Sequence, residues 1–203
     1  MSIALTNSVG SFFHEAVGEA VRQQQVEATD QAMSYLVALL TDFTHPDPVR
    51  DGAFDRPLAF LLDEALRTSG AERFQRLRAL GDSVLYISGF FGDHIENRGV
   101  DAAYVTTVGA TAYQGVAAML RRPSLDLEGP RRDENVFGEL ATKFDRFVDV
   151  LTTVADSTLA QQAKSGRAVL KLYERWQRSG SEILARELGA RGIVPCRGTG
   201  GIH

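Results

Sequence analysis

The stretch ISGFFGDHIENR, residues 87–98, places two phenylalanines just before the acid–histidine–acid group of Asp93, His94 and Glu96. Such side chains could supply a general base or a metal ligand. On a helix, residues one or two positions apart do not face each other, so these three cannot form a chelate or an acid–base pair alone. Burying two phenylalanines contributes about 3–6 kcal/mol, whereas an exposed ion pair contributes about 0–1 kcal/mol. We therefore expect burial to set the conformation, with both acids in solvent and His94 at the edge of an apolar row.

His94 keeps a chemical role under this interpretation. It shares a side of the predicted helix with Ile87 and Phe91, where partial desolvation would keep the imidazole neutral. A neutral imidazole beside aromatic rings could bind haem iron or act as a general base. A histidine that simply lies at the edge of the core explains the same pattern.

Other groupings of reactive side chains are weaker. His14, Glu15 and Glu19 have helical spacing, but the two glutamates share the polar face and His14 is rotated away from it, which favours solvated charges. Glu-x-x-His occurs nowhere in the chain, which argues against a di-iron bundle. The sequence also lacks the nucleophile elbow, the phosphate loop and the zinc helix motif. Cys196, with no base beside it, is expected to be an ordinary exposed thiol.

The amino-acid composition argues against several classes of protein function and structure. The chain has 203 residues, 22 of them basic and 26 acidic, for a net charge of −4. This balance argues against a broad nucleic-acid surface, which needs clustered lysine and arginine. A single cysteine excludes an intramolecular disulfide and a multi-cysteine metal centre. No stretch approaches the roughly 18–20 apolar residues of a membrane span, and the first residues lack the pattern of a secretory signal, so the expected location is the cytoplasm.

Apolar residues recur at steps of three and four along most of the chain, which is the pattern of amphipathic helices. Helices are predicted at about 11–22, 29–43, 55–66, 71–95, 101–120, 137–154, 165–178 and 181–190. Prolines and glycines interrupt the pattern at 44–52 and 121–133. The predicted fold is therefore all-α. It is a single domain of about eight helices over residues 1–192, with 121–133 as a candidate subdomain boundary and 193–203 as a flexible tail.

The helix at about 71–95 is predicted to be central, because residues 84–91 are apolar almost all round. Gly81 and Gly89 each lower its helicity by about 1 kcal/mol, and the usual compensation is the close approach of another backbone. One alternative stays open. Residues 84–91 and 104–109 are rich in β-branched and aromatic residues and could form strands, although the unbroken three–four spacing favours helix.

Three functions remain open at this level. The first, favoured because no motif fixes a reaction, is a non-catalytic interaction or regulatory module that self-associates or docks on a protein partner. The second is a helical bundle that binds an apolar or haem-like ligand. Its pocket would be lined by His94, Phe90, Phe91, Tyr104, Tyr113 and Trp176. The third is a hydrolytic or acid–base enzyme in which His94 acts with a carboxylate from another helix, such as Glu15 or Asp145.

Overall fold

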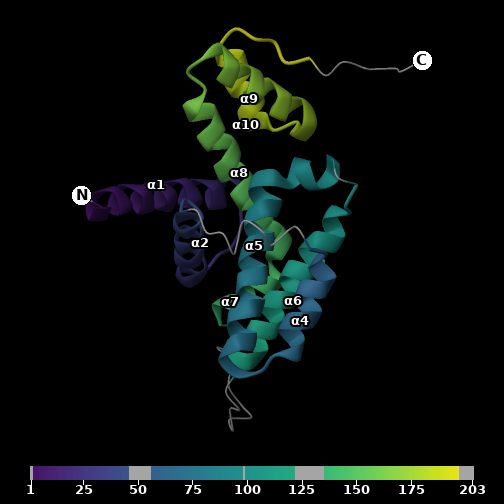
Figure 1. Cartoon of the computed structure of the whole chain (residues 1–203). Coiled ribbons are helices and arrows are strands. Elements are labelled where there is room, and N and C mark those ends of the chain that lie inside the picture. The colour runs from purple at the N-terminus through teal and green to yellow at the C-terminus, as the bar shows by residue number, and fades with distance from the viewer. Residues whose placement is uncertain (1, 46–55, 98, 122–134, 197–203) are drawn as a thin grey trace. The chain divides into compact units, whose positions relative to one another are not determined.

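The computed structural model describes residues 2–45, 56–97, 99–121 and 135–196, and all regular structure within these ranges is helical (Figure 1). The helices are α1 (Ser2–Gln23), α2 (Asp30–Asp42), α4 (Leu58–Arg67), α5 (Gly70–Asn97), α6 (Ala102–Leu120), α7 (Val136–Thr142), α8 (Phe144–Gln162), α9 (Gly166–Ser179) and α10 (Glu182–Ala190). The predicted all-α fold is confirmed. The strand alternative is wrong, because residues 84–91 and 104–109 lie inside α5 and α6.

Local capping explains several of the helix starts. The Thr29 side chain accepts a hydrogen bond from the Ala32 amide at the start of α2, and Asp101 accepts one from the Ala103 amide at the start of α6. The structure extends the predicted helix at 11–22 back to Ser2. Of the predicted helix at 55–66, residue 55 lies outside the described ranges, and α4 begins directly after Pro57.

The single helix predicted at 137–154 is wrong, because the structure divides it into α7 and α8. Lys143 separates them with φ −107° and ψ 26°. Hydrogen bonds continue across the break, from the Lys143 amide to the Glu139 carbonyl and from the Phe147 amide to the Lys143 carbonyl. The Lys143 ammonium also bonds the Glu27 carbonyl, which lies beyond the reach of a sequence pattern. The apolar spacing persists through the break because Phe137, before it, and Phe147, after it, both remain buried.

The chain forms two compact units, Met1–Leu151 and Thr152–His203, with the boundary inside α8. Most of the candidate boundary at 121–133 and most of the predicted tail lie outside the described residues. In the first unit α5 packs against α2, α4 and α6, while α7 packs against α2 and α6, and α1 against α2. Figure 1 shows α5 and α6 side by side. No helix in the described ranges is both long enough and apolar enough to cross a bilayer.

Helical glycines allow close packing at several places in the first unit, as the sequence suggested for Gly81 and Gly89. A Cβ added to Gly81 would lie 2.7 Å from the Tyr113 ring, and one added to Gly89 would lie 2.4 Å from the Cβ of Leu151. At Gly109 in α6 the added carbon would meet the Phe144 ring at 2.4 Å. These distances are too short for any side chain, so glycine sets the separation of the helices here.

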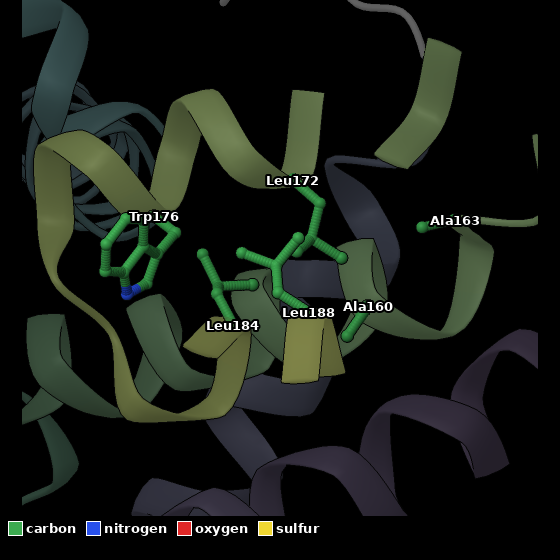
Figure 2. Packing of buried hydrophobic residues seen from close by; sticks show 6 residues of the cluster. All are labelled: Ala160, Ala163, Leu172, Trp176, Leu184 and Leu188. Atoms are coloured by element: carbon green, nitrogen blue, oxygen red, sulfur yellow. The ribbon is translucent and has the colours of Figure 1, made fainter. Parts of the chain in front are cut away.

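The second unit has its own small core. It is formed by Ala160, Ala163, Leu172, Trp176, Leu184 and Leu188, and Figure 2 shows these side chains together. Asp156 is almost fully buried and pairs with the Arg175 guanidinium at 2.5 Å. Arg191 donates to the carbonyls of Ala160 and Ala163 at the end of α8, which satisfies helix-terminal acceptors that would otherwise need water.

Candidate functional site

The first unit contains a carboxylate shared by three helices. Asp82 of α5 accepts hydrogen bonds on the same oxygen, Oδ1, from the hydroxyl of Tyr35 in α2 at 2.5 Å and from that of Tyr113 in α6 at 2.7 Å. Tyr113 is fully buried. Because these three residues are distant in sequence, their bonds fix the mutual position of α2, α5 and α6.

Arg78 completes this polar cluster one helical turn before Asp82. Its Nε donates to the Tyr35 hydroxyl at 3.1 Å and lies 3.4 Å from Asp82 Oδ2. The guanidinium carbon also lies 5.5 Å from the centroid of the Tyr35 ring, in cation–π geometry. The Arg78 side chain remains 45% exposed. One edge of the guanidinium is thus held by the protein while part of the side chain stays in contact with solvent.

Aromatic packing positions the cluster. Gly81 leaves room for the Tyr113 ring beside α5. The Phe137 ring lies 5.3 Å from Tyr35 and 5.8 Å from Tyr113, and Phe144 lies 5.9 Å from Tyr113 on another side. The phenol groups therefore point inward from an apolar wall, where each needs a hydrogen-bond partner. Asp82 supplies that partner.

The electrostatics of the cluster follow from this burial. Desolvation raises the pKa of Asp82, while the two tyrosine donors and Arg78 oppose that shift. Burial and the nearby carboxylate raise the pKa of Tyr113 well above its ordinary value, and burial does the same for the pKa of Tyr35. Both phenols therefore stay protonated and act as donors. Since both are committed to Asp82, the arrangement joins helices rather than presenting a proton to a substrate.

This environment predicts an unusual pH dependence. A raised pKa means that folded Asp82 binds its proton more tightly than it does in the unfolded chain, where the ordinary value is 3.8. Folding stability contributed by the protonated form is therefore lost as pH rises from about 4 through the raised pKa. We expect the free energy of unfolding of the native protein to fall across this window relative to Asp82→Asn, which does not titrate. Urea unfolding at a series of pH values measures that difference, and parallel pH profiles would contradict it.

A second feature, the aromatic ladder, consists of Phe43, Tyr86, Phe90 and Phe91. Phe43 follows the last residue of α2 and stacks on Tyr86 of α5, with ring centroids 4.1 Å apart. Tyr86 stacks in turn on Phe90 at 4.9 Å and meets Phe91 edge-on at 5.9 Å. The ladder continues the contact between α2 and α5 that the polar cluster begins.

Phe91 lies at a kink in α5, where its backbone leaves helical geometry with φ −131° and ψ 25°. Figure 1 shows the end of α5 turning away from the axis of its earlier part. Phe91 is 50% exposed, whereas Phe90 is partly buried. The expectation that burial would enclose both phenylalanines is therefore wrong for Phe91. The kink prevents a continuous helix from carrying its ring toward the core.

A polar groove lies between α6, α7 and the start of α8. Its volume is about 320 Å³, and its lining includes Thr107, Thr111, Gln114, Arg121, Thr142 and Asp145. Four threonines line the groove, and each hydroxyl donates to a carbonyl one turn earlier in its own helix. The two charged lining residues have opposite sign. The lining therefore does not select strongly for one class of ligand.

The structure distributes the predicted ligand-binding residues over several places. Phe90 and Phe91 belong to the ladder, Tyr113 to the polar cluster, and Trp176 to the core of the second unit. Tyr104 is 43% exposed on α6. The backbone of His94 lies in α5, but its side chain is outside the described residues. A ligand site at these positions stays a prediction.

The structure also shows where the weaker candidate residues from the sequence lie. Glu19 is exposed and pairs with Arg22 at 2.6 Å, in agreement with the solvated interpretation of the His14 segment. Asp145 lines the polar groove, and Cys196 is exposed as expected. No group of three or more metal-ligating side chains comes together in the described part of the chain.

Sequence reasoning missed the polar cluster and half of the ladder. The signal available was the spacing of Arg78, Asp82, Tyr86 and Phe90, which lie four residues apart. An acid at position 82, between the buried Leu80 and Val84, is the one strongly polar residue in the most apolar part of α5. Its partners could not be identified from spacing, because they belong to other helices.

Comparison of the chain with models of known protein families, with curated proteins and with solved structures finds no match.

Proposed function

We propose that this protein is a non-catalytic interaction module that binds a segment of a partner protein along the aromatic ladder. The observation that carries the proposal is the half-exposed ring of Phe91 at the end of a stack of aromatic side chains. Exposed, clustered aromatic surface is a common feature of protein-binding sites.

The energetics support this assignment. A phenylalanine side chain buries about 150–250 Å² when it is enclosed, so the exposed half of Phe91 leaves about 100 Å² of apolar surface in water. Covering that area would contribute about 2.5 kcal/mol at 25 cal/mol per Å². Tyr86 contacts the Phe91 ring edge-on and is itself stacked between Phe43 and Phe90, so it holds the ring in place. A partner would therefore gain this free energy with little loss of conformational freedom.

The rigidity of the surrounding scaffold also supports docking. The polar cluster fixes α2 against α5, and the ladder is built from the same two helices. A preorganised surface of this kind loses less entropy on association than a mobile one. The two tyrosine hydroxyls of the polar cluster are already bonded to Asp82, which supports a structural role for these three groups and a non-catalytic role for the module.

The proposal is tested by Phe91→Ser. Peptides selected from a displayed library of random 20-residue segments on the native protein provide the probe, and fluorescence anisotropy measures their affinity. We expect Phe91→Ser to weaken the selected peptides about tenfold or more, because a central aromatic anchor is worth about 2 kcal/mol. Circular dichroism checks that the variant keeps its helices.

Phe60→Ser is the matched control. Phe60 is 61% exposed on α4 and has no place in the ladder, so its loss should leave peptide affinity unchanged. Selected peptides that bind Phe91→Ser as well as the native protein would contradict the proposal. Light scattering measures the oligomeric state. If the native protein is a dimer and Phe91→Ser is a monomer, the surface binds a second copy of this chain and the proposed partner segment is wrong.

A further inference from the structure

The exposed cation of the polar cluster and the aromatic ladder are joined in one strip of residues along α5, with the exposed Phe91 ring next to its last member. Arg78, Asp82, Tyr86 and Phe90 are spaced by four residues along α5. Tyr35 of α2 contacts the first two, and Phe43, just after α2, stacks on the third. The same row therefore follows the junction of α2 and α5 from the charged end to the aromatic end.

The protein fixes the orientation of the Arg78 guanidinium but does not bond all of its N–H donors. Its Nε faces the Tyr35 hydroxyl and Asp82 Oδ2, and its central carbon lies over the Tyr35 ring. Within the described ranges, Arg78 donates its hydrogen bond from Nε, and neither terminal Nη nitrogen makes a hydrogen bond. Five N–H donors in a rigid fork suit bidentate binding of a carboxylate, and a preset orientation lowers the entropy cost of that binding.

Asp82 leaves Arg78 able to bind a second carboxylate. Its Oδ1 is held by two tyrosine hydroxyls at 2.5 and 2.7 Å, while its Oδ2 lies 3.4 Å from Arg78 Nε. The phenols are thus its shorter and stronger partners. The shortest contact between Asp82 and Arg78 is to Nε, and the Nη donors, which make no hydrogen bond to Asp82, can bind a negatively charged group on a partner.

We infer that the partner segment carries a carboxylate side chain that binds Arg78 and, farther along, an apolar side chain that covers Phe91. The inference rests on the proposed docking function and names the chemistry of its partner. Arg78 and Phe91 are thirteen residues apart, which is roughly 20 Å along the helix. The acidic and apolar residues of the partner are therefore about thirteen positions apart if the segment is helical and about six apart if it is extended.

The displayed-peptide selection gives the first test. Peptides selected on the native protein should carry Asp or Glu at one of these separations from an aromatic or large aliphatic residue. Selection on Arg78→Gln should remove the acidic preference and keep the apolar one. Peptides with no acidic preference on the native protein would overturn the inference.

A double-mutant cycle gives the second test. Replacing the acidic residue of a selected peptide by its amide should weaken binding to the native protein about fivefold, as expected for a partly exposed charge-assisted pair. The same replacement should have little effect on binding to Arg78→Gln. Arg76→Gln is the matched control, because Arg76 is similarly exposed on α5 and pairs with Glu72. In this variant, replacing the acidic residue of the peptide by its amide should still weaken binding about fivefold.

The outcomes separate the two proposals. If Phe91→Ser abolishes binding while the acid-to-amide ratio is the same in native protein and Arg78→Gln, the docking function stands and the role of Arg78 is wrong. If binding ignores Phe91, the docking function itself fails. If Arg78→Gln does not fold, Arg78→Lys is used in its place. An ammonium bound to Tyr35 and Asp82 has no second nitrogen with which to bind the peptide carboxylate. If the acidic peptide still binds this variant about fivefold more tightly than its amide, the inference is overturned.

Discussion

Replacing Asp82 with alanine should lower the free energy of unfolding by about 2–3 kcal/mol. The fully buried hydroxyl of Tyr113 would lose its carboxylate acceptor, and an unsatisfied buried donor costs about 1–3 kcal/mol. The Tyr35 hydroxyl would lose the same acceptor in a partly buried position, and the loss of a hydrogen bond there costs about 1 kcal/mol. Removal of a desolvated carboxylate offsets part of this loss. Urea unfolding followed by far-ultraviolet circular dichroism measures the change.

Two variants make this result specific. Asp82→Asn keeps an oxygen that accepts from both phenols, so it should lose clearly less stability than the alanine variant. Asp63→Ala removes an exposed carboxylate paired with Arg67 at 2.8 Å and should change stability by less than about 1 kcal/mol. If Asp82→Ala were as stable as Asp63→Ala, the polar cluster would not be what joins the three helices.

Replacing Gly89 with alanine should cost about 2–4 kcal/mol, although alanine is the better helix former. The new methyl carbon would lie 2.4 Å from Leu151 Cβ and 3.4 Å from the Leu151 backbone. A Cβ cannot rotate away from such a contact, so α5 and α8 must separate and their packing is lost. Overpacking of this kind typically costs 1–3 kcal/mol, and it is expected to be larger where the backbone itself must shift.

Gly92→Ala is the matched control for this substitution. Gly92 lies three residues farther along α5 and has no neighbour within 4 Å of the added carbon. There the higher helix propensity of alanine should stabilise the protein by up to about 1 kcal/mol. Opposite signs at positions 89 and 92, measured by the same urea titration, would identify close helix packing as the cause. Equal and small effects at both positions would contradict the contact with Leu151.

These two expectations concern the same scaffold. The polar cluster sets the position of α2 against α5, and Gly89 sets the distance between α5 and the first part of α8. The ladder and Arg78 depend on this scaffold for their orientation. A substitution that loosens it should therefore weaken peptide binding even where it touches no residue of the strip.

The sequence predicted the helices well because the relevant information is local. The three–four spacing of apolar residues and the caps at Thr29 and Asp101 act within one or two turns. The sequence did not predict the break at Lys143, because hydrogen bonds and buried positions continue through it and the periodic pattern does not change. Its cause includes a bond from Lys143 to the Glu27 carbonyl, 116 residues away along the chain.

The sequence by itself determined an all-helical chain, the central place of α5 and the need for close packing at its glycines, since periodicity, propensity and side-chain size are properties of neighbouring residues. Only the tertiary structure decided that Asp82 meets Tyr35, 47 positions away, and Tyr113, 31 positions away, and that Phe91 remains half exposed. Hydrogen bonding between distant helices and the exposure left by a kink depend on how the helices are placed. A pattern of residues along one helix carries no information about that placement.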